Sequence, residues 1–400
     1  MEQEKMKIDI LPNQFLKLNG TFDKSEAIKL SGKIAGVCYD KEGFAHLANE
    51  AEEKTMRRVD LTLNNGHHSV YDHILINFNI QNIPKILSMV LNNEKQYTTS
   101  EKSARYTPIV RTKDSIITEK EERLYNKWIE LFKVKIKSQY GNFYNDAKIQ
   151  KLAQENARYL VTVFMPTQMI YSTSLRQINY IASWMLDYIN NVNKNNIFEK
   201  KLASYMKDFL ECLDKLNVLE DGLMKNEKYR KLSLFGKDLE KKVDYFGDVY
   251  STNYLASFAL LAQAQRHRTL DYQMEISDEK EFFIPPILLD DMTLVSEWLN
   301  DMIEVKDINP QGELVVINEM GKYDDFILKC KERLCSAAQL EIMYKTRDTL
   351  LKYKEALEVS NHPLKEDIKK YSHGPRCTFP DFKCTSDCKF REIKSLTRKI

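Results

Sequence analysis

Arg266, His267 and Arg268 stand together near the middle of the chain, and their side chains suit the binding of an anion. Arginine presents a rigid planar fork that grips phosphate or carboxylate through two hydrogen bonds. A histidine between two such forks suits a cofactor with phosphates and a polar ring. The alternative is a helix end, where basic side chains complement the helix dipole and meet solvent. Taken alone, the triplet favours the helix end, because cations near helix C-termini are common.

A second set of polar side chains alternates earlier in the chain, at Glu101, Ser103 and Arg105. An extended backbone would point all three to the same side. That side would offer an acceptor, a hydroxyl and a guanidinium, which suits a sugar phosphate. The alternative is a polar, solvated loop.

Three histidines, His67, His68 and His73, lie within seven residues at a predicted junction of loop and strand. Metal binding is one interpretation, but the segment has no pair of ligands at helical i, i+4 spacing. We therefore favour a structural or cofactor-contacting loop.

The C-terminal part of the chain is rich in cysteine. Together with Cys335, the residues Cys377, Cys384 and Cys388 are predicted to hold a structural zinc ion. Cys330 and His373 are alternative fourth ligands. The spacing differs from the usual paired Cys-x2-Cys knuckle, and free thiols are the competing interpretation. The odd number of seven cysteines argues against a secreted disulfide framework.

Local patterns predict the elements that position these residues. The segment 74–80 is rich in β-branched and aromatic residues and predicts a strand, and Pro84 is predicted to open a helix. The periodic segment 119–138 predicts a long helix. The apolar stretch 254–262, directly before the arginine triplet, predicts a buried helix.

Composition narrows the class of protein. The chain has 400 residues, with 60 Lys and Arg against 58 Asp and Glu, and a net charge of +2. This balance gives no electrostatic reason to expect a nucleic-acid or membrane partner. Mean hydropathy is −0.49 and no apolar run approaches a membrane span, so we expect a cytoplasmic protein.

Read in order, these segments resemble the flavin-dependent thymidylate synthases. That family has an Arg-His-Arg triplet shortly before a Glu-x-Ser-x-Arg-Tyr element, and here the two parts are separated. The first occurrence keeps Glu101, Ser103, Arg105 and Tyr106 but has Asn93–Lys95 in place of the triplet. The second keeps Arg266–Arg268, preceded by Gln263, but has Met274, Ile276 and Asp278 in place of the other element. It also carries the family's Arg-x5-Gln-x-Glu-Ile element at 333–342.

The resemblance implies reductive methylation of dUMP to dTMP, with FAD, NADPH as reductant and methylenetetrahydrofolate as carbon donor. It implies FAD contacts from Arg266, His267, Arg268, His67 and Ser69. Nucleotide contacts are implied for Glu101, Ser103, Arg105, Gln263 and Arg176, the last being displaced by three residues from the family's arginine. Arg105, with the reduced flavin, would activate the uracil. Ser103 occupies the catalytic element but has no recognisable base nearby, so it is assigned to binding.

Each half of the chain keeps one of the two family elements and lacks the other. We interpret this pattern as a fused tandem of two diverged copies. The predicted division is 1–215 for the first copy, 216–360 for the second and 361–400 for the cysteine-containing tail. Because family members are homotetramers with shared active sites, we expect a homodimer with one FAD site per chain. The expected fold is α+β, with antiparallel strands flanked by long helices in each half. Two alternatives stay open: methylation or hydroxymethylation of another pyrimidine nucleotide, and an inactive scaffold that binds nucleotide or flavin.

Overall fold

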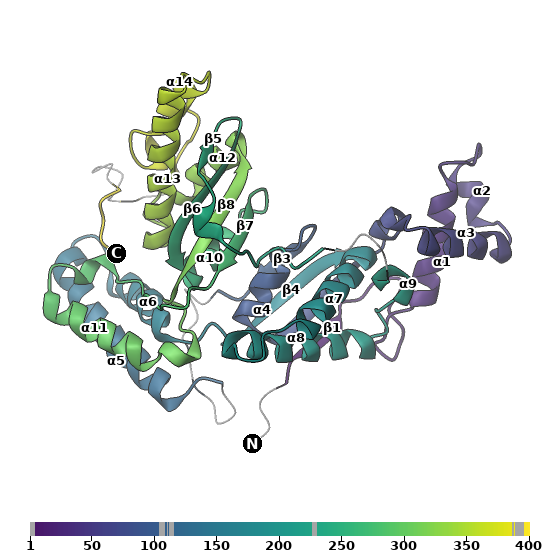
Figure 1. The fold of residues 1–400 in the computed structure, drawn as a ribbon, viewed down its shortest axis with the longest axis horizontal. Helices are drawn as coiled ribbons and strands as arrows, with labels where there is room; N and C mark the ends of the chain where they lie inside the picture. The colour runs from purple at the N-terminus through teal and green to yellow at the C-terminus, as the bar shows by residue number, and fades with distance from the viewer. Residues whose placement is uncertain are drawn as a thin grey trace. The chain divides into compact units, whose positions relative to one another are not determined.

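Two four-stranded antiparallel sheets organise the chain (Figure 1). The computed structural model describes residues 5–103, 109, 111, 116–225, 230–385, 388 and 396–400. The chain divides into two compact units. Unit 1 comprises Met1–Lys102 and Pro166–Leu232, and unit 2 comprises Ser103–Met165 and Ser233–Ile400.

The sheet of unit 1 has the strand order β1-β2-β4-β3. Its strands are β1 (Lys7–Ile10), β2 (Leu75–Pro84), β3 (Thr98–Glu101) and β4 (Pro166–Ser174). Ile76, Phe78 and Ile80 alternate on the buried face of β2, which explains the strand signal in the sequence. The predicted strand is confirmed and continues to Pro84. There α4 (Lys85–Leu91) begins, as the proline predicted.

The helices of unit 1 form two groups, and one of them packs against this sheet. They are α1 (Lys24–Gly36), α2 (Phe44–Ala48), α3 (Glu52–Asn64), α7 (Leu175–Asn190), α8 (Ile197–Lys215), α9 (Asp221–Met224) and the 3-10 helix η1 (His68–His73). Figure 1 shows α7 and α8 side by side, with α8 also contacting β1. The helices α1, α2 and α3 form a second group within the unit.

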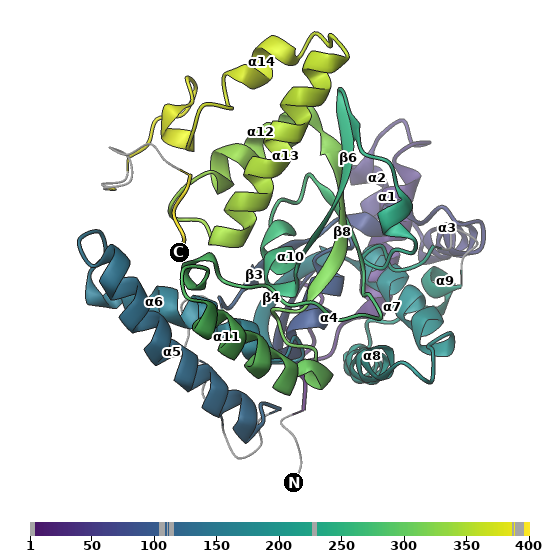
Figure 2. The same cartoon turned by 60° about the vertical axis from the view of Figure 1, so that its left-hand side comes forward.

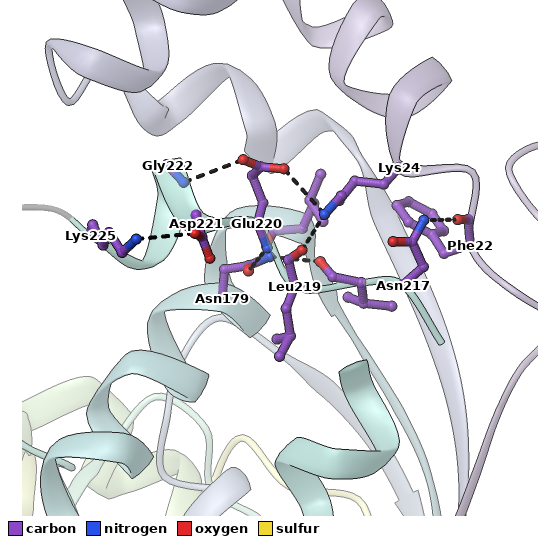
Figure 3. A network of polar contacts seen from close by, with 11 residues as sticks. Phe22, Lys24, Asn179, Asn217, Leu219, Glu220, Asp221, Gly222 and Lys225 are labelled. Atoms are coloured by element: carbon purple, nitrogen blue, oxygen red, sulfur yellow. Dashed lines mark hydrogen bonds and ion pairs between the residues drawn. The ribbon is translucent and has the colours of Figure 1, made fainter. Parts of the chain in front are cut away.

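A polar network ties α1 to the segment after α8 (Figure 3). The buried side chain of Asn179, on α7, accepts from Glu220 N at 2.7 Å and donates to Val218 O at 3.1 Å. The Nζ atom of Lys24, in the first turn of α1, lies 2.5 Å from Leu219 O and 3.4 Å from the Glu220 carboxylate. These contacts satisfy backbone groups where the chain reverses direction.

The sheet of unit 2 has the order β5-β6-β8-β7. Its strands are β5 (Tyr245–Phe246), β6 (Val249–Ser257), β7 (Asp271–Glu275) and β8 (Leu314–Lys322). The prediction of one buried helix over 254–262 was wrong in its first half. Residues 254–257 end β6, paired with β8, and α10 (Phe258–Ala264) begins only after Ser257. A short apolar run suits a buried strand as well as a buried helix, and here pairing with β8 decides.

Unit 2 also holds two groups of helices. They are α5 (Glu119–Tyr140), α6 (Asp146–Ala157), α11 (Met292–Glu304), α12 (Tyr323–Arg333), α13 (Leu340–Val359) and α14 (Lys365–Lys369). The short 3-10 turns are η2 (Arg158–Leu160), η3 (Leu239–Lys241), η4 (Pro286–Leu288), η5 (Lys306–Ile308) and η6 (Arg376–Thr378). Figure 2 shows α12 and α13 beside β6 and β8.

The predicted helix over 119–138 is confirmed as α5, which begins with a capping box between Thr118 and Glu121. Its apolar side packs in a core with α6 and α11, where the rings of Trp128 and Trp298 meet edge to face at 4.8 Å. The Trp128 indole N–H donates to Asp301 at 2.7 Å.

The predicted α+β class, with antiparallel strands flanked by helices, is confirmed. Across the described ranges, the helices are each too short or too polar to span a lipid bilayer.

Candidate functional site

The turn that follows α10 carries the arginine triplet. Arg266 and Arg268 are exposed, whereas His267 between them is buried, with 5% of its surface accessible. The turn thus offers two cationic forks to solvent on either side of an imidazole. Because α10 ends two residues earlier, at Ala264, the triplet does lie at a helix end, as the simpler interpretation expected.

The imidazole of His267 is held by α12. Arg333 Nε donates to His267 Nε2 at 2.6 Å, and the Nδ1 atom lies 3.6 Å from the Glu332 carboxylate. Burial, followed by the charges of Arg333 and Lys329, lowers the pKa of His267 to about 2. His267 is therefore neutral at physiological pH, with Nε2 as acceptor and Nδ1 as donor.

Gln263 projects from the last turn of α10 and is also buried. Its Nε2 donates to Gln339 Oε1 at 2.7 Å, and Gln339 Nε2 donates to the Tyr159 hydroxyl. Tyr159 donates to Glu341 Oε2 at 3.0 Å. Burial raises the pKa of Glu341, against the effect of its hydrogen bonds from Ser257 and Tyr159.

In unit 1, Glu101 ends β3 and is fixed by neighbouring α4. Its carboxylate accepts from Lys85 Nζ at 2.6 Å and from Ser88 Oγ at 3.0 Å. The strand ends at Glu101, so the predicted alternation with Ser103 is not part of the sheet. Arg105 and Tyr106 lie outside the described residues.

Arg176, the displaced candidate for nucleotide binding, pairs with an acidic neighbour in unit 1. Its Nε donates to Asp72 Oδ1 at 3.0 Å, and its Nη2 lies 2.5 Å from Asp72 Oδ2. The same carboxylate accepts from Ser174, the N-cap of α7, at 2.6 Å. A role in binding substrate would require Arg176 to exchange this partner.

The histidine-rich loop of unit 1 presents its residues in two directions. His67 and Ser69 are exposed and therefore accessible to a ligand. His68 between them is buried, with Nδ1 2.8 Å from the Tyr180 hydroxyl and Nε2 3.0 Å from Leu63 O. His68 therefore anchors the loop.

The position in unit 1 that resembles the triplet has a different chemistry. The Glu94 side chain is fully buried, and its Oε2 lies 2.5 Å from Arg230 Nη2. The Arg230 guanidinium stacks 3.8 Å from the ring centroid of Trp184. A buried carboxylate already paired with an arginine of the same unit does not provide a second anion site.

FAD carries two phosphates and a ring system with acceptor atoms, and the two units fit it differently. In unit 2, the exposed guanidinium groups of Arg266 and Arg268 and the Nδ1–H of His267 are suitable donors. In unit 1, Glu94 would repel a phosphate. The residues present therefore fit FAD at the turn after α10 and do not fit it at Asn93–Lys95.

Two cysteine-bearing segments contact the turn after α12, which itself carries Cys335. Arg376 N, beside Cys377, donates to Leu334 O at 2.7 Å, and Cys388 Sγ lies 3.0 Å from Ser336 Oγ. Cys335 Sγ accepts from Ala337 N at 3.4 Å. Within the part of the chain that is described, no three or more His, Cys, Asp or Glu side chains are grouped so as to hold a metal ion. The zinc site remains a prediction.

The predicted site residues divide between the units. His67, Ser69, Glu101 and Arg176 belong to unit 1, whereas Gln263 and Arg266–Arg268 belong to unit 2 with Ser103. Sequence reasoning gave no role to Tyr159, Gln339 or Glu341. The only available signal was the Gln-x-Glu pattern at 339–341, which lies far from Gln263 in sequence.

Part of the chain is similar to proteins of known family. Residues 22–190 match the family model described as thymidylate synthase complementing protein. A flavin-dependent thymidylate synthase from Pyrococcus furiosus is 22% identical over 150 residues, which cover 36% of this chain and 57% of that relative. The chain thus matches little more than half the length of this curated relative.

Two solved structures are similar to parts of the chain. One is a UMP/dUMP methylase from Streptomyces cacaoi bound with 5-Br dUMP, with TM-score 0.32, 13% identity, and coverage of 55% of this chain and 99% of that one. The other is a thymidylate synthase X from Helicobacter pylori with FAD and dUMP, with TM-score 0.30, 16% identity, and coverage of 55% and 100%.

The strand order and flanking helices define an α+β protein with two antiparallel sheets. Residues 22–190 are similar to the thymidylate synthase complementing protein family, and 150 residues of the chain are similar to a flavin-dependent thymidylate synthase.

Proposed function

We propose that this protein is a flavin-dependent thymidylate synthase that methylates dUMP to dTMP. The observation that carries the proposal is the turn after α10, where exposed Arg266 and Arg268 flank the buried, neutral His267. Two exposed cationic forks beside an uncharged donor suit a diphosphate joined to a polar ring. The family match over 22–190 supports the same chemistry.

The proposed roles follow from the chemistry of each side chain. Arg266 and Arg268 hold the FAD phosphates, and His267, with exposed His67 and Ser69, contacts the cofactor. Bound FAD would carry an electron pair from NADPH to the one-carbon unit, which methylenetetrahydrofolate donates. The uracil would lose its C5 hydrogen as a proton and gain the methyl group, and the carrier would leave as tetrahydrofolate.

The nucleotide would be gripped by Glu101, Ser103 and Arg105, with Gln263 and Arg176 completing the site. Lys85 and Ser88 hold the Glu101 carboxylate in place, which prepares it to accept a hydrogen bond from a sugar hydroxyl. Arg105 would polarise the uracil as charge develops on its oxygen. Arg176 would join only by leaving Asp72.

We further propose that the chain is a tandem of two diverged copies that acts as a homodimer. The two sheets share one strand order, β1-β2-β4-β3 and β5-β6-β8-β7, which supports duplication. In each, a short helix joins the second and third strands in sequence, α4 in one and α10 in the other. The buried Glu94–Arg230 pair supports loss of the flavin site from the first copy.

Flavin binding tests the proposal directly. We expect the full chain to take up FAD, and Arg266→Ala combined with Arg268→Ala to weaken FAD binding by at least tenfold, because two charge-assisted contacts to phosphate are lost. Fluorescence titration of FAD measures this. Arg347→Ala, on α13 of the same unit and paired with Asp348, is the matched control and should leave FAD affinity unchanged.

Turnover separates the candidate substrates. With FAD, NADPH and methylenetetrahydrofolate present, we expect dTMP to form from dUMP faster than methylated products form from UMP or dCMP. A preference for UMP or dCMP would assign the enzyme to another pyrimidine nucleotide. Failure to bind FAD would favour the inactive scaffold.

A zinc ion held by Cys335, Cys377, Cys384 and Cys388 remains part of the proposal. Its support is the hydrogen bond from Arg376 N to Leu334 O, which joins the chain next to Cys377 to the chain next to Cys335. Such an ion would stabilise a tail too short to build a core.

A further inference from the structure

A buried chain of hydrogen bonds runs from the predicted nucleotide contact Gln263 to a carboxylate in the interior of unit 2. Its members are, in order, Gln263, Gln339, Tyr159 and Glu341, and each is at most 5% exposed. They come from α10, the N-cap of α13, η2 and the first turn of α13. Buried amides and hydroxyls that bond only to one another must match donors to acceptors at every step.

Ser257 sets the direction of this chain at its inner end. The backbone N–H of Ser257 donates to Glu341 Oε1 at 2.8 Å, and a backbone N–H has no alternative role. The Ser257 hydroxyl accepts from Leu260 N at 3.1 Å and donates to Glu341 Oε2 at 2.5 Å. Ionised Glu341 accepts hydrogen bonds on both oxygens, and the hydrogen bonds from Ser257 and Tyr159 favour this charged form against the effect of burial on its pKa.

The acceptor role of Glu341 then sets the direction of each hydrogen bond between it and Gln263. Tyr159 gives its single hydroxyl hydrogen to Glu341, so it must accept from the Gln339 amide nitrogen. Gln339 consequently turns its carbonyl oxygen to Gln263, which must donate with Nε2. Oε1, the acceptor of the Gln263 amide, is left to meet a ligand, together with the second hydrogen of Nε2.

We propose that Glu341, Tyr159 and Gln339 are positioning residues that fix Gln263 as a hydrogen-bond acceptor, so that the site reads a donor on the pyrimidine edge. Uracil carries such a donor at N3, whereas cytosine has an acceptor there. The inference rests on the proposed function, because it places a pyrimidine nucleotide at Gln263. Beyond that function, it identifies Gln263 Oε1 as the group that determines specificity and Glu341, Tyr159 and Gln339 as the residues that orient it.

The isosteric substitution Glu341→Gln tests the polarity. An amide at 341 can still accept from Ser257 N with its oxygen, but its nitrogen must donate to Tyr159. Tyr159 then donates to Gln339, both glutamine amides turn over, and Gln263 presents N–H to the ligand. We expect the affinity for dUMP to fall about tenfold and the ratio of dUMP to dCMP affinity to fall by more than that.

The measurement is equilibrium binding of dUMP and dCMP to the FAD-loaded full chain, by calorimetry. Tyr159→Phe is a second variant, which breaks the chain without reversing it. It should reduce the dUMP to dCMP ratio towards one. Tyr353→Phe is the matched control, because Tyr353 is equally buried in unit 2 and its hydroxyl donates to Gly247 O at 2.5 Å, away from the chain. The ratio of dUMP to dCMP affinity in Tyr353→Phe should equal that of the wild type.

The outcomes separate the two proposals. If the wild type binds neither nucleotide, the proposed function fails. If the wild type prefers dUMP and Glu341→Gln keeps that ratio while thermal melting shows an intact fold, the inference is overturned. Equal losses for dUMP and dCMP would point to a sugar hydroxyl as the donor and would also overturn the assignment to the base.

Discussion

His267 is a neutral histidine between two exposed cations, and its burial fixes that state. Protonation would place a third positive charge beside Arg333 and Lys329 in a desolvated position, which is why its pKa falls to about 2. A neutral ring can both accept from Arg333 and donate through Nδ1. The exposed arginines can then bind an anion without a positive charge on the ring between them.

This environment predicts a pH dependence of stability. The pKa of His267 is about 2 in the folded chain, against about 6.5 for an unperturbed histidine, so the unfolded state binds the proton preferentially. The stabilisation is complete above about pH 6.5 and declines as pH falls toward 2. At pH 5 the loss is roughly 2 kcal/mol.

Urea denaturation at pH 7 and pH 5 measures this loss. His267→Gln should remove that part of the difference between the two pH values, whereas His67→Gln, at an exposed position, should leave it in place. An unchanged difference in His267→Gln would show that another group is responsible.

At the scale of elements, α7 links the sheet of unit 1 to the helices around it. Ser174 caps its N-terminus, and Asn179 on its buried side binds the chain that leaves α8. The network around Lys24 and Glu220 then joins that chain to α1 (Figure 3). One amide side chain thus connects segments that are distant in sequence.

Replacing this amide should be costly. Asn179→Ala leaves buried Val218 O and Glu220 N without their partner, so we expect a loss of about 3 kcal/mol in the free energy of unfolding. Asn191→Ala, at the exposed C-cap of the same helix, should cost less than about 0.5 kcal/mol. Equal effects of the two substitutions, measured by chemical denaturation, would contradict a role for the Asn179 contacts.

Across the whole molecule, the two sheets share one strand order, but the chemistry differs at the turns that follow α4 and α10. Unit 2 keeps exposed arginines after α10, whereas unit 1 has the Glu94–Arg230 pair after α4. If the turn after α10 suits FAD and the turn after α4 does not, the chain would bind one FAD molecule.

We therefore expect one FAD per chain and a dimer in solution. Absorbance of flavin released from purified protein, compared with protein concentration, measures the first, and light scattering measures the second. Two flavins per chain would contradict loss of the first site. Elemental analysis of the same samples, purified without chelator, should find one zinc ion per chain, and its absence would remove the cysteine proposal.

Residue patterns alone were enough to predict the fold class, the long helix at 119–138, the strand at 74–80 and the order of the family motifs. These features depend on side-chain periodicity and on local residue types, which the chain carries wherever it folds. Residue patterns misjudged the helix at 254–262, because an apolar run of that length does not distinguish a strand from a helix until a partner strand such as β8 pairs with it.

Which side chains meet could not be predicted from the sequence, because it depends on how the chain folds. Hydrogen bonds and ion pairs join residues far apart in sequence, as Tyr159 meets Glu341, Glu94 meets Arg230 and Arg333 meets His267. The burial that makes His267 neutral and the carboxylate that orients Gln263 both come from such distant partners. The residue types were readable from the sequence, but protonation and hydrogen-bond direction depend on the surroundings that folding creates.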